Sequence, residues 1–441
     1  MDQSQLSMDT LVAWAKSRGF IWPGSDIYGG LANSWDYGPL GVALKNNIKQ
    51  AWWKRFVTER LDMVGLDAAI IMNPKVWQAS GHVATFSDPL VECKNCHERY
   101  RADQIDLTAA CPHCGQSGQF TAPAAFNLMF KTFIGPKEAE ENVAYLRPET
   151  AQAMFVDWPL ILNASRKRLP FGVAQIGKAF RNEITPGNFI FRTREFEQME
   201  IEYFVPEREW ENHFAAWLSE LRSWMNFCGI DAARVHELEV PEDERAHYSK
   251  RTVDIEFDFP FGRKELYGLA YRTDFDLRSH MEASGKDLRY TDPQSGEKYL
   301  PHVIEPSLGV DRTVLAVLVS AYTEEQAPTA EGGMDTRIVM KFPKALAPVK
   351  VAILPLSKKE ELMAVARPLA EQLAKKWAVD YDETQSIGKR YRRQDEIGTP
   401  YCITVDFDSL NDQAVTVRDR DSMAQERVAI ADLENYLSQK L

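Results

Sequence analysis

The sequence lacks a long apolar run, an excess of positive charge and a leader-like start. No stretch of roughly 18 consecutive apolar residues occurs, which argues against a transmembrane helix. The formal net charge is −12, so any binding of nucleic acid must depend on local basic patches. The N-terminus has no basic region followed by an apolar stretch, and Asp2 and Asp9 argue against a transit peptide. We therefore expect a cytoplasmic protein that is not bound to a membrane.

Cysteine is scarce, and its placement is unlike that of a secreted disulfide framework. Four of the six cysteines form two Cys-x2-Cys pairs, at Cys93, Cys96, Cys111 and Cys114. This spacing is typical of a metal site in a reducing compartment. Four thiolates can surround Zn²⁺ and leave no open position, so we predict a structural zinc site with His97 and His113 as bystanders. The alternative is a set of four thiols that binds no metal.

With 441 residues, 44% of them hydrophobic and 11% aromatic, the chain is long enough for about two or three domains with large cores. A polar, turn-rich segment, 323–348, ends in two prolines, and we place a domain boundary there. Strands and helices alternate over residues 346–441, which predicts a small α/β domain. Residues 1–345 form the larger domain, and the cysteine segment, about 92–120, is an insert in it.

Periodicity predicts several elements of the larger domain. An apolar residue recurs every fourth position from Leu44 to Phe56, which predicts a helix over about 40–62. That stripe fits either a core or a dimer interface, and periodicity favours the core. We also expect a strand at 68–72, a helix with a tryptophan-rich buried stripe over 207–227, and a half-buried strand at 251–259. A polar loop or hairpin is expected from about 275 to 300.

The segment Phe180–Phe204 has the most unusual pattern. A turn at Pro186–Asn188 separates two predicted strands, which form a hairpin over 172–204. After the turn the residues alternate, as in a strand with two different faces. One face becomes apolar and can pack in the core. The other carries Arg194, Phe196, Gln198, Glu200 and Glu202. Buried charges are costly unless they are paired, so this face predicts a site for a charged ligand with a flat ring.

Three segments resemble, in order, the three motifs of the class II aminoacyl-tRNA synthetases. Phe180-Arg181-Asn182-Glu183, a loop and Arg192-x3-Phe196 resemble motif 2. Leu308-Gly309-Val310-Asp311-Arg312 resembles motif 3. The helix over 40–62, with the chain to Pro74, resembles motif 1, the dimer element. Four further segments are similar to the dimeric, single-polypeptide type of glycyl-tRNA synthetase: Gly30–Gly41, Leu146–Gln152, Phe196–Glu200 and Tyr271–Asp274.

This resemblance covers essentially the whole chain. It implies an α+β fold, with a class II synthetase-like antiparallel sheet flanked by helices and a C-terminal α/β anticodon-binding domain with a mixed sheet. It implies an aminoacyl-tRNA ligase that activates glycine with ATP to glycyl-adenylate and pyrophosphate, then transfers glycine to the 3′ end of tRNA(Gly). It also implies a homodimer. Tyr267 and Leu308 depart slightly from the expected pattern, and we expect them to tune activity without abolishing it.

The resemblance also assigns an ATP site. Arg181 would contact the α-phosphate and Arg312 the γ-phosphate, and both would be catalytic, because fixed cations stabilise the charge that builds on the phosphate oxygens. Phe196 would stack on adenine, and Glu183 would address its amino group. Mg²⁺ would bridge the phosphates, with Glu265 as its acidic partner. The full set is Arg181, Asn182, Glu183, Phe191, Arg192, Arg194, Phe196, Glu265, Leu266, Gly309 and Arg312.

Glycine offers only an ammonium, a carboxylate and two hydrogens, so selection must come from caging the ammonium and crowding Cα. The resemblance implies Glu149, Glu200 and Glu305 around the ammonium, since clustered acids repel one another without a cation. Arg101 or Arg272 would lie near the carboxylate. The full set is Arg101, Glu149, Gln198, Glu200, Arg272, Glu305 and Ser307. By position alone, Glu149 also fits an ordinary acid at a helix start.

The basic run Lys389–Arg393 lies in an otherwise acidic chain, and it fits either a solvated helix face or a phosphate contact for the anticodon stem. Rival functions also stay open. The first is a non-catalytic paralogue, which the retained arginines of motifs 2 and 3 argue against. The second is an enzyme for serine, threonine or proline, which the glutamates and the missing editing domain argue against. A zinc-based regulatory module would explain only the cysteine segment.

Overall fold

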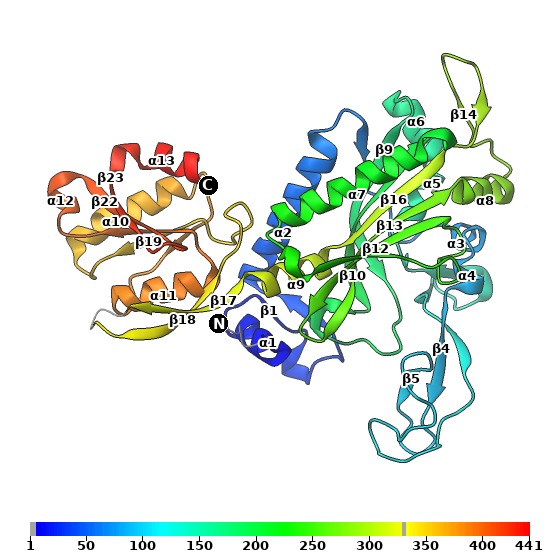
Figure 1. Ribbon diagram of the computed structural model, residues 1–441, viewed down its shortest axis with the longest axis horizontal. Helices are drawn as coiled ribbons and strands as arrows, with labels where there is room; N and C mark the ends of the chain where they lie inside the picture. Colours follow the sequence, from blue (N-terminus) through cyan, green and yellow to red (C-terminus); the bar gives the residue numbers. More distant parts are fainter. Residues whose placement is uncertain (1–5, 329–331) are drawn as a thin grey trace.

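A seven-stranded sheet forms the centre of the larger, N-terminal part of the molecule (Figure 1). The computed structural model describes residues 6–328 and 332–441. Neighbouring strands are antiparallel, except for the parallel pair of edge strand β3 with β9. In order across the sheet the strands are β11 (Val235–Glu239), β12 (Arg251–Phe259), β13 (Gly262–Thr273), β16 (His302–Gly309), β10 (Glu195–Val205), β9 (Phe171–Phe180) and β3 (Met63–Gly65). The predicted antiparallel sheet and its central hairpin are confirmed.

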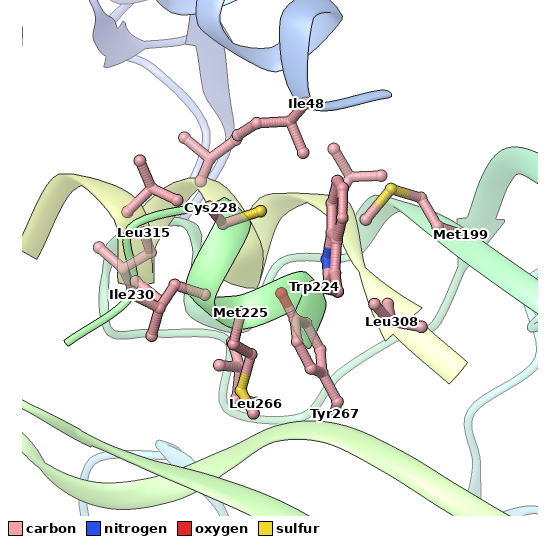
Figure 2. Packing of buried hydrophobic residues seen from close by; sticks show 14 of the residues in the cluster. Ile48, Met199, Trp224, Met225, Cys228, Ile230, Leu266, Tyr267, Leu308 and Leu315 are labelled. Carbon is pink, nitrogen blue, oxygen red and sulfur yellow. The ribbon is translucent and has the colours of Figure 1, made fainter. Parts of the chain in front are cut away.

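Three helices cover one face of this sheet: α2 (Pro39–Trp53), α7 (Trp210–Phe227) and α9 (Val310–Ala321). Figure 2 shows how Ile48 of α2, Trp224 of α7 and Leu315 of α9 gather with Met199 of β10 in one apolar cluster. The stripe predicted for α2 is buried there, so it belongs to the core and not to a dimer interface. A π-helical turn follows α2 and ends at Thr58, earlier than predicted.

The opposite face of β9 and β10 is covered at one end by α5 (Ala151–Val156), α6 (Trp158–Ser165) and α8 (Phe275–Ser284). Trp158 packs there against Phe171 and Phe204, which alternate along the strands with the residues of the first core. The expectation of a loop after residue 274 was wrong for α8. It holds for the hairpin that follows, β14 (Tyr290–Thr291) with β15 (Lys298–Tyr299).

The cysteine segment projects from the main body on a three-stranded sheet (Figure 1). Its strands are β4 (Ser87–Glu92), β5 (Arg99–Arg101) and β6 (Ala124–Asn127). The remaining elements of the N-terminal part are α1 (Met8–Ser17), β1 (Ile21–Pro23), β2 (Trp35–Tyr37), α3 (Pro74–Ala79), α4 (His82–Thr85), β7 (Lys131–Phe133) and β8 (Val143–Tyr145). The strand predicted at 68–72 was wrong, because the backbone groups of Ala68 bind the side chains of Gln175 and Arg147 instead of a neighbouring strand.

The C-terminal part has its own five-stranded mixed sheet, as predicted, with a separate hydrophobic core. In order its strands are β20 (Val379–Tyr381), β19 (Val351–Pro355), β21 (Tyr401–Val405), β22 (Ala414–Asp419) and β23 (Gln425–Ala429). Its helices are α10 (Glu360–Leu373), α11 (Ile387–Ile397), α12 (Ser409–Asp412) and α13 (Leu433–Lys440). Nowhere in residues 6–328 and 332–441 is a helix long and apolar enough to cross a membrane.

A hairpin connects the two parts, where the sequence predicted only polar turns. Its strands are β17 (Tyr322–Pro328) and β18 (Met334–Met340), and β18 packs against α11. The fully buried Arg337 of β18 lies 3.0 Å from a carboxylate oxygen of Asp395 on α11, which Arg418 of β22 also contacts. The hairpin therefore precedes the C-terminal sheet in sequence but shares a buried ion-pair cluster with it.

Candidate active site

Two adjoining cavities lie over β10, β13 and β16. One is lined by arginines and aromatic rings, and the other contains a group of acids that includes Glu149, Glu200 and Glu305. Arg181, Gln198, Glu265 and Ser307 line both cavities, so the two are continuous. Of the predicted ATP residues, the first cavity contains Arg181, Glu183, Phe191, Arg192, Phe196, Glu265, Leu266, Gly309 and Arg312. Of the predicted glycine residues, the second contains Glu149, Gln198, Glu200, Glu305 and Ser307. The structure thus brings most of both sets together.

Arg181 stands where the two cavities meet. It follows β9 directly, and its Nε donates to the carbonyl of Pro148 at 3.1 Å. Its guanidinium lies 5.3 Å from the ring centres of both Phe86 and Phe196. Within the described residues, its two terminal nitrogens make no hydrogen bond. The side chain is therefore held in place with its donors directed to a ligand, which suits an anionic group.

Arg312 lines the first cavity from the first turn of α9. Its Nη1 donates to the Glu265 carbonyl at 3.0 Å and lies 3.2 Å from Glu265 Oε2. The guanidinium also lies 4.4 Å from the centre of the Phe191 ring. These contacts place a fixed positive charge beside a carboxylate, the combination that a magnesium-bound polyphosphate requires.

Glu183 contributes a buried acceptor to the first cavity. Its side chain is 9% exposed, and its Oε2 has no hydrogen-bond partner among the described residues. An unpaired buried acceptor costs about 1–3 kcal/mol. A ligand that donates an N–H there would remove that cost.

Four predicted residues line neither cavity: Asn182, Arg194, Arg101 and Arg272. Arg194 precedes β10, so the alternation of the strand does not fix its direction, and its Nη1 donates to the Ala32 carbonyl at 3.3 Å. Arg194 and Asn182 line a neighbouring cavity beside Trp35. Arg101 stays within the insert, where ion pairs with Asp88 and Asp103, at 2.7 and 2.8 Å, hold it. The geometry gives no support to an ATP contact for Asn182 or Arg194, or to a glycine contact for Arg101.

Glu200 lies at the centre of the second cavity and is 2% exposed. Its Oε1 accepts from Ser307 Oγ at 2.8 Å and from Gln198 Nε2 at 3.2 Å. Its Oε2 accepts from the backbone N–H and the hydroxyl of Thr150. Burial and the nearby Glu149 raise the pKa of Glu200. A bound cation would relieve both effects.

Glu149 is held from behind by two residues that the sequence did not single out. Gln152 Nε2 donates to Glu149 Oε1 at 3.0 Å, and His82 Nε2 lies 3.3 Å from Glu149 Oε2. Burial alone would raise the pKa of Glu149, but His82 and Arg272 outweigh it and hold that pKa well below its ordinary value. Glu149 is therefore an ionised carboxylate. The Gln152 contact could have been predicted from the sequence, because Gln152 lies three residues after Glu149 at the start of the same helix. The His82 contact could not.

Arg272 lies beneath the acidic cavity and does not line it. The side chain is 1% exposed, and it donates to both oxygens of Asp276 at 2.8 Å and to Glu305 Oε1 at 2.7 Å. With its donors occupied, Arg272 orients Glu305 and offsets part of the negative charge. Burial, with Glu200 and Glu149 nearby, still raises the pKa of Glu305 to about 8.

Glu202 is a further buried acid that the alternation placed on this face without assigning it a role. It is 0% exposed, and neither carboxylate oxygen has a partner within the described residues. Burial and the adjacent Glu305 raise its pKa well above the ordinary value. Carboxylate oxygens of Glu200, Glu202 and Glu305 lie within 4.8 Å of one another, close enough to surround one cation.

The four cysteines of the insert lie together. Sγ–Sγ distances are 3.7 Å between Cys93 and Cys114 and 3.8 Å between Cys96 and Cys111. Tetrahedral Zn–S bonds of about 2.3 Å place sulfurs roughly 3.8 Å apart, so the thiols fit zinc. His97 is 75% exposed and pairs with Glu92, which agrees with its interpretation as a bystander.

The two departures from the expected pattern, Tyr267 and Leu308, are both fully buried in the first core (Figure 2). The Tyr267 hydroxyl pairs with that of Thr313 at 3.0 Å. Neither residue lines either of the two cavities. An effect on activity would have to act through the packing of the sheet.

Comparisons with known proteins agree with this geometry. Residues 132–321 match the family described as "tRNA synthetase class II core domain (G, H, P, S and T)", and residues 350–440 match "Anticodon binding domain". The chain is 52% identical over 458 aligned residues to a glycine–tRNA ligase of Thermobifida fusca, covering 99% of this chain and 98% of that one. It is 51% identical to the glycine–tRNA ligase of Cutibacterium acnes (99% and 97% covered) and 53% identical to that of Staphylococcus aureus (98% of each). The chain therefore belongs to the glycine–tRNA ligase family of class II tRNA synthetases.

Proposed function

We propose that the acidic cavity binds glycine and the arginine-lined cavity binds ATP, so that their reacting groups meet at Arg181. The chain is an aminoacyl-tRNA ligase that activates glycine with ATP and transfers it to tRNA. The observation that supports this placement is the continuity of the two cavities, with one fixed cation at their junction. In activation, the glycine carboxylate attacks the α-phosphate and pyrophosphate leaves.

The arginines stabilise the charge that develops in this step. Arg181 donates to the α-phosphate oxygens, and Arg312 holds the γ-phosphate end of a bent ATP. Phe196 stacks on the adenine, and the unpaired Glu183 Oε2 accepts from its amino group. Glu265 would hold Mg²⁺, which would supply further positive charge at the leaving pyrophosphate.

Glycine is recognised by its ammonium. Glu149, Glu200 and Glu305 converge on the acidic cavity, and Arg272 keeps Glu305 in position. A side chain on Cα would collide with the cavity wall, so alanine is rejected without a separate editing step. Such a pocket excludes larger amino acids by shape, while an amine is required to balance the acids.

Pyrophosphate exchange tests this assignment directly. The purified chain should exchange labelled pyrophosphate into ATP in the presence of glycine, and much more slowly with alanine or serine. No glycine-dependent exchange would contradict the enzyme assignment. Equal rates with the three amino acids would contradict the proposed selectivity.

The insert is proposed to bind one structural Zn²⁺ through Cys93, Cys96, Cys111 and Cys114. Zinc bound by four thiolates would fix the fold of the insert and take no part in the reaction. Metal analysis of the purified chain should find about one equivalent of zinc. Less than about half an equivalent would contradict a stable site.

The remaining assignments concern the whole assembly. We propose a cytoplasmic homodimer, with a catalytic domain in residues 1–345 and an anticodon-binding domain in 346–441. Of the basic run on α11, Lys389 is exposed and able to meet tRNA phosphates, whereas Arg390 is buried and is not. Light scattering should give twice the mass of one chain; a single-chain mass at micromolar concentration would contradict the dimer.

A further inference from the structure

The short helix α4 lies between the cysteine insert and the acidic cavity. Its first residue, His82, places Nε2 3.3 Å from Glu149 Oε2, and its Nδ1 lies 2.8 Å from Ser80 Oγ. The imidazole also lies between two rings, with centre distances of 5.5 Å to Trp77 and 5.4 Å to Phe86. Together these contacts fix the orientation of the His82 imidazole.

The segment that leaves the cysteine insert, at residues 127–128, is hydrogen-bonded to the backbone of α4 and of Phe86. Asn127, the last residue of β6, donates its side-chain amide to the carbonyls of His82 and Val83 at 3.2 and 3.0 Å. The next residue, Leu128, donates its N–H to the Phe86 carbonyl at 3.0 Å. These bonds connect the exit of the insert to the helix that carries His82.

The same helix reaches both halves of the site. His82 contacts Glu149, and Phe86, just after α4, lies beneath Arg181 with 5.3 Å between guanidinium and ring centre. On its other side Glu149 is held by Gln152, whose amide orientation is fixed because its oxygen is 2.8 Å from His280 Nε2. Burial lowers the pKa of His280. Each Glu149 oxygen thus has one protein partner behind the cavity.

We propose that His82 is a positioning residue, which holds Glu149 in the orientation that receives the glycine ammonium. The inference rests on the proposed function, since it takes the acidic cavity as the glycine site. A carboxylate with only Gln152 behind it can rotate about its last torsion, which would turn the plane of its two oxygens away from the ligand. Residues 127–128 hold α4, and through it His82 and Glu149. They therefore influence glycine affinity without contacting glycine.

The simpler interpretation is that His82 only fills space between Trp77 and Phe86. Glutamine and asparagine at this position distinguish the two. On the same backbone, the terminal amide of a glutamine side chain reaches about as far as Nε2 of histidine. An asparagine side chain is shorter by one carbon and cannot reach Glu149. Both substitutions remove the ring, so a packing role predicts the same result for H82Q and H82N.

The experiment is glycine-dependent pyrophosphate exchange, with KM measured for glycine and for ATP. For H82N we expect a glycine KM about 10-fold higher, equivalent to the loss of one hydrogen bond to a charged group, and an ATP KM within about twofold of the parent. For H82Q we expect a glycine KM within about threefold of the parent. H97Q is the matched control, because His97 is exposed on the insert, and both of its KM values should be unchanged.

Equal glycine KM values for H82N and H82Q, or an unchanged KM in H82N, would overturn the positioning role. A rise in both the glycine and the ATP KM in H82N would overturn it too, because general loosening of α4 would move both cavities. A parent chain without glycine-dependent exchange would instead contradict the proposed function, and this inference with it.

Discussion

At the scale of single residues, glycine binding and ATP binding can be tested separately, because β10 carries one proposed contact for each. Glu200 is proposed to meet the glycine ammonium and Phe196 the adenine, so their substitutions should have opposite effects. We expect Glu200→Gln to raise the glycine KM by at least about 10-fold with little change in the ATP KM. Phe196→Ala should raise the ATP KM by about 10-fold and leave the glycine KM nearly unchanged.

Pyrophosphate exchange at varied glycine and ATP concentrations measures both constants. Glu195→Gln is the matched control for Glu200→Gln. Glu195 lies on the same strand but is exposed and pairs with Lys178, so its substitution should change neither constant. Parallel changes in both constants for either variant would contradict the separation.

The raised pKa of Glu305, about 8, makes a prediction about pH. Below that pH the empty site holds a proton on Glu305, and a bound ammonium favours the ionised form. Glycine binding should therefore release protons near pH 7, and the glycine KM should fall as pH rises from 6 to 8. Calorimetry in buffers of different ionisation enthalpy measures the release. Proton uptake, or a KM that rises over this range, would contradict the assignment.

Most residues of this site were predicted from the sequence, but the residues that hold them in place were not. Arg181, Phe196, Glu200 and Arg312 were identified because they lie in short motifs with fixed spacing. His82 was not predicted, because its partner Glu149 lies far away in the sequence and no periodicity links the two residues. For Arg194 the alternation was a weak guide, because β10 begins one residue later.

At the scale of elements, α11 shows how far a basic run can mislead. Arg390 is 1% exposed, and it donates to the carbonyls of Asp382 and Leu356 at 3.1 and 3.2 Å and to that of Pro355. Arg393 pairs with Asp382. The arginines on this face of α11 hold loops of the C-terminal domain together, which sequence alone could not distinguish from a tRNA contact.

Substitutions on α11 should therefore separate stability from tRNA binding. Arg390→Ala leaves three carbonyls without a donor and should lower the free energy of unfolding by about 2–4 kcal/mol. Lys389→Ala, one residue away and exposed, should leave stability within about 0.5 kcal/mol and weaken tRNA binding. Denaturant unfolding and tRNA titration measure the two effects. Equal stability of both variants would contradict the structural role of Arg390.

The elements that sequence missed share a cause. α8 is largely polar, with only Leu277 and His280 among its buried residues besides Asp276, so its periodicity is weak. Its ends were nevertheless marked, by an acid before the first turn and by Gly285 in the left-handed region with φ of 69°. The strand β17 is likewise mostly polar, and β18 packs against α11 of the C-terminal part while its Met340 joins the core of the main sheet.

At the scale of the whole molecule, Asp395 ties the connecting hairpin to the C-terminal sheet. It is 0% exposed and contacts Arg337 at 3.0 Å and Arg418 at 2.8 Å. Asp395→Ala leaves two buried arginines without this partner, and we expect a loss of about 3–5 kcal/mol. Arg337→Ala leaves Asp395 paired with Arg418, so the loss should be smaller, about 1–3 kcal/mol.

Unfolding of each variant in denaturant tests that order. Lys376→Ala is the control, because its pair with Glu434 is exposed and should contribute less than about 1 kcal/mol. A larger loss for Arg337→Ala than for Asp395→Ala would contradict the shared role of the carboxylate. The two-part architecture itself was predictable, since the change from antiparallel strands to alternating strands and helices is visible in the sequence.

The pairing of strand β10 also limits which insertions this enzyme can tolerate. It is hydrogen-bonded on both sides, with Phe196 opposite Ala179, and Glu200 opposite Gln175 and Ser307. Four residues of strand fix the distance between Phe196 and Glu200 at about 13 Å. One inserted residue would turn Glu200 toward the apolar core, and two would lengthen the interval by about 7 Å. Descendants of this gene therefore cannot change the count of residues between these two side chains.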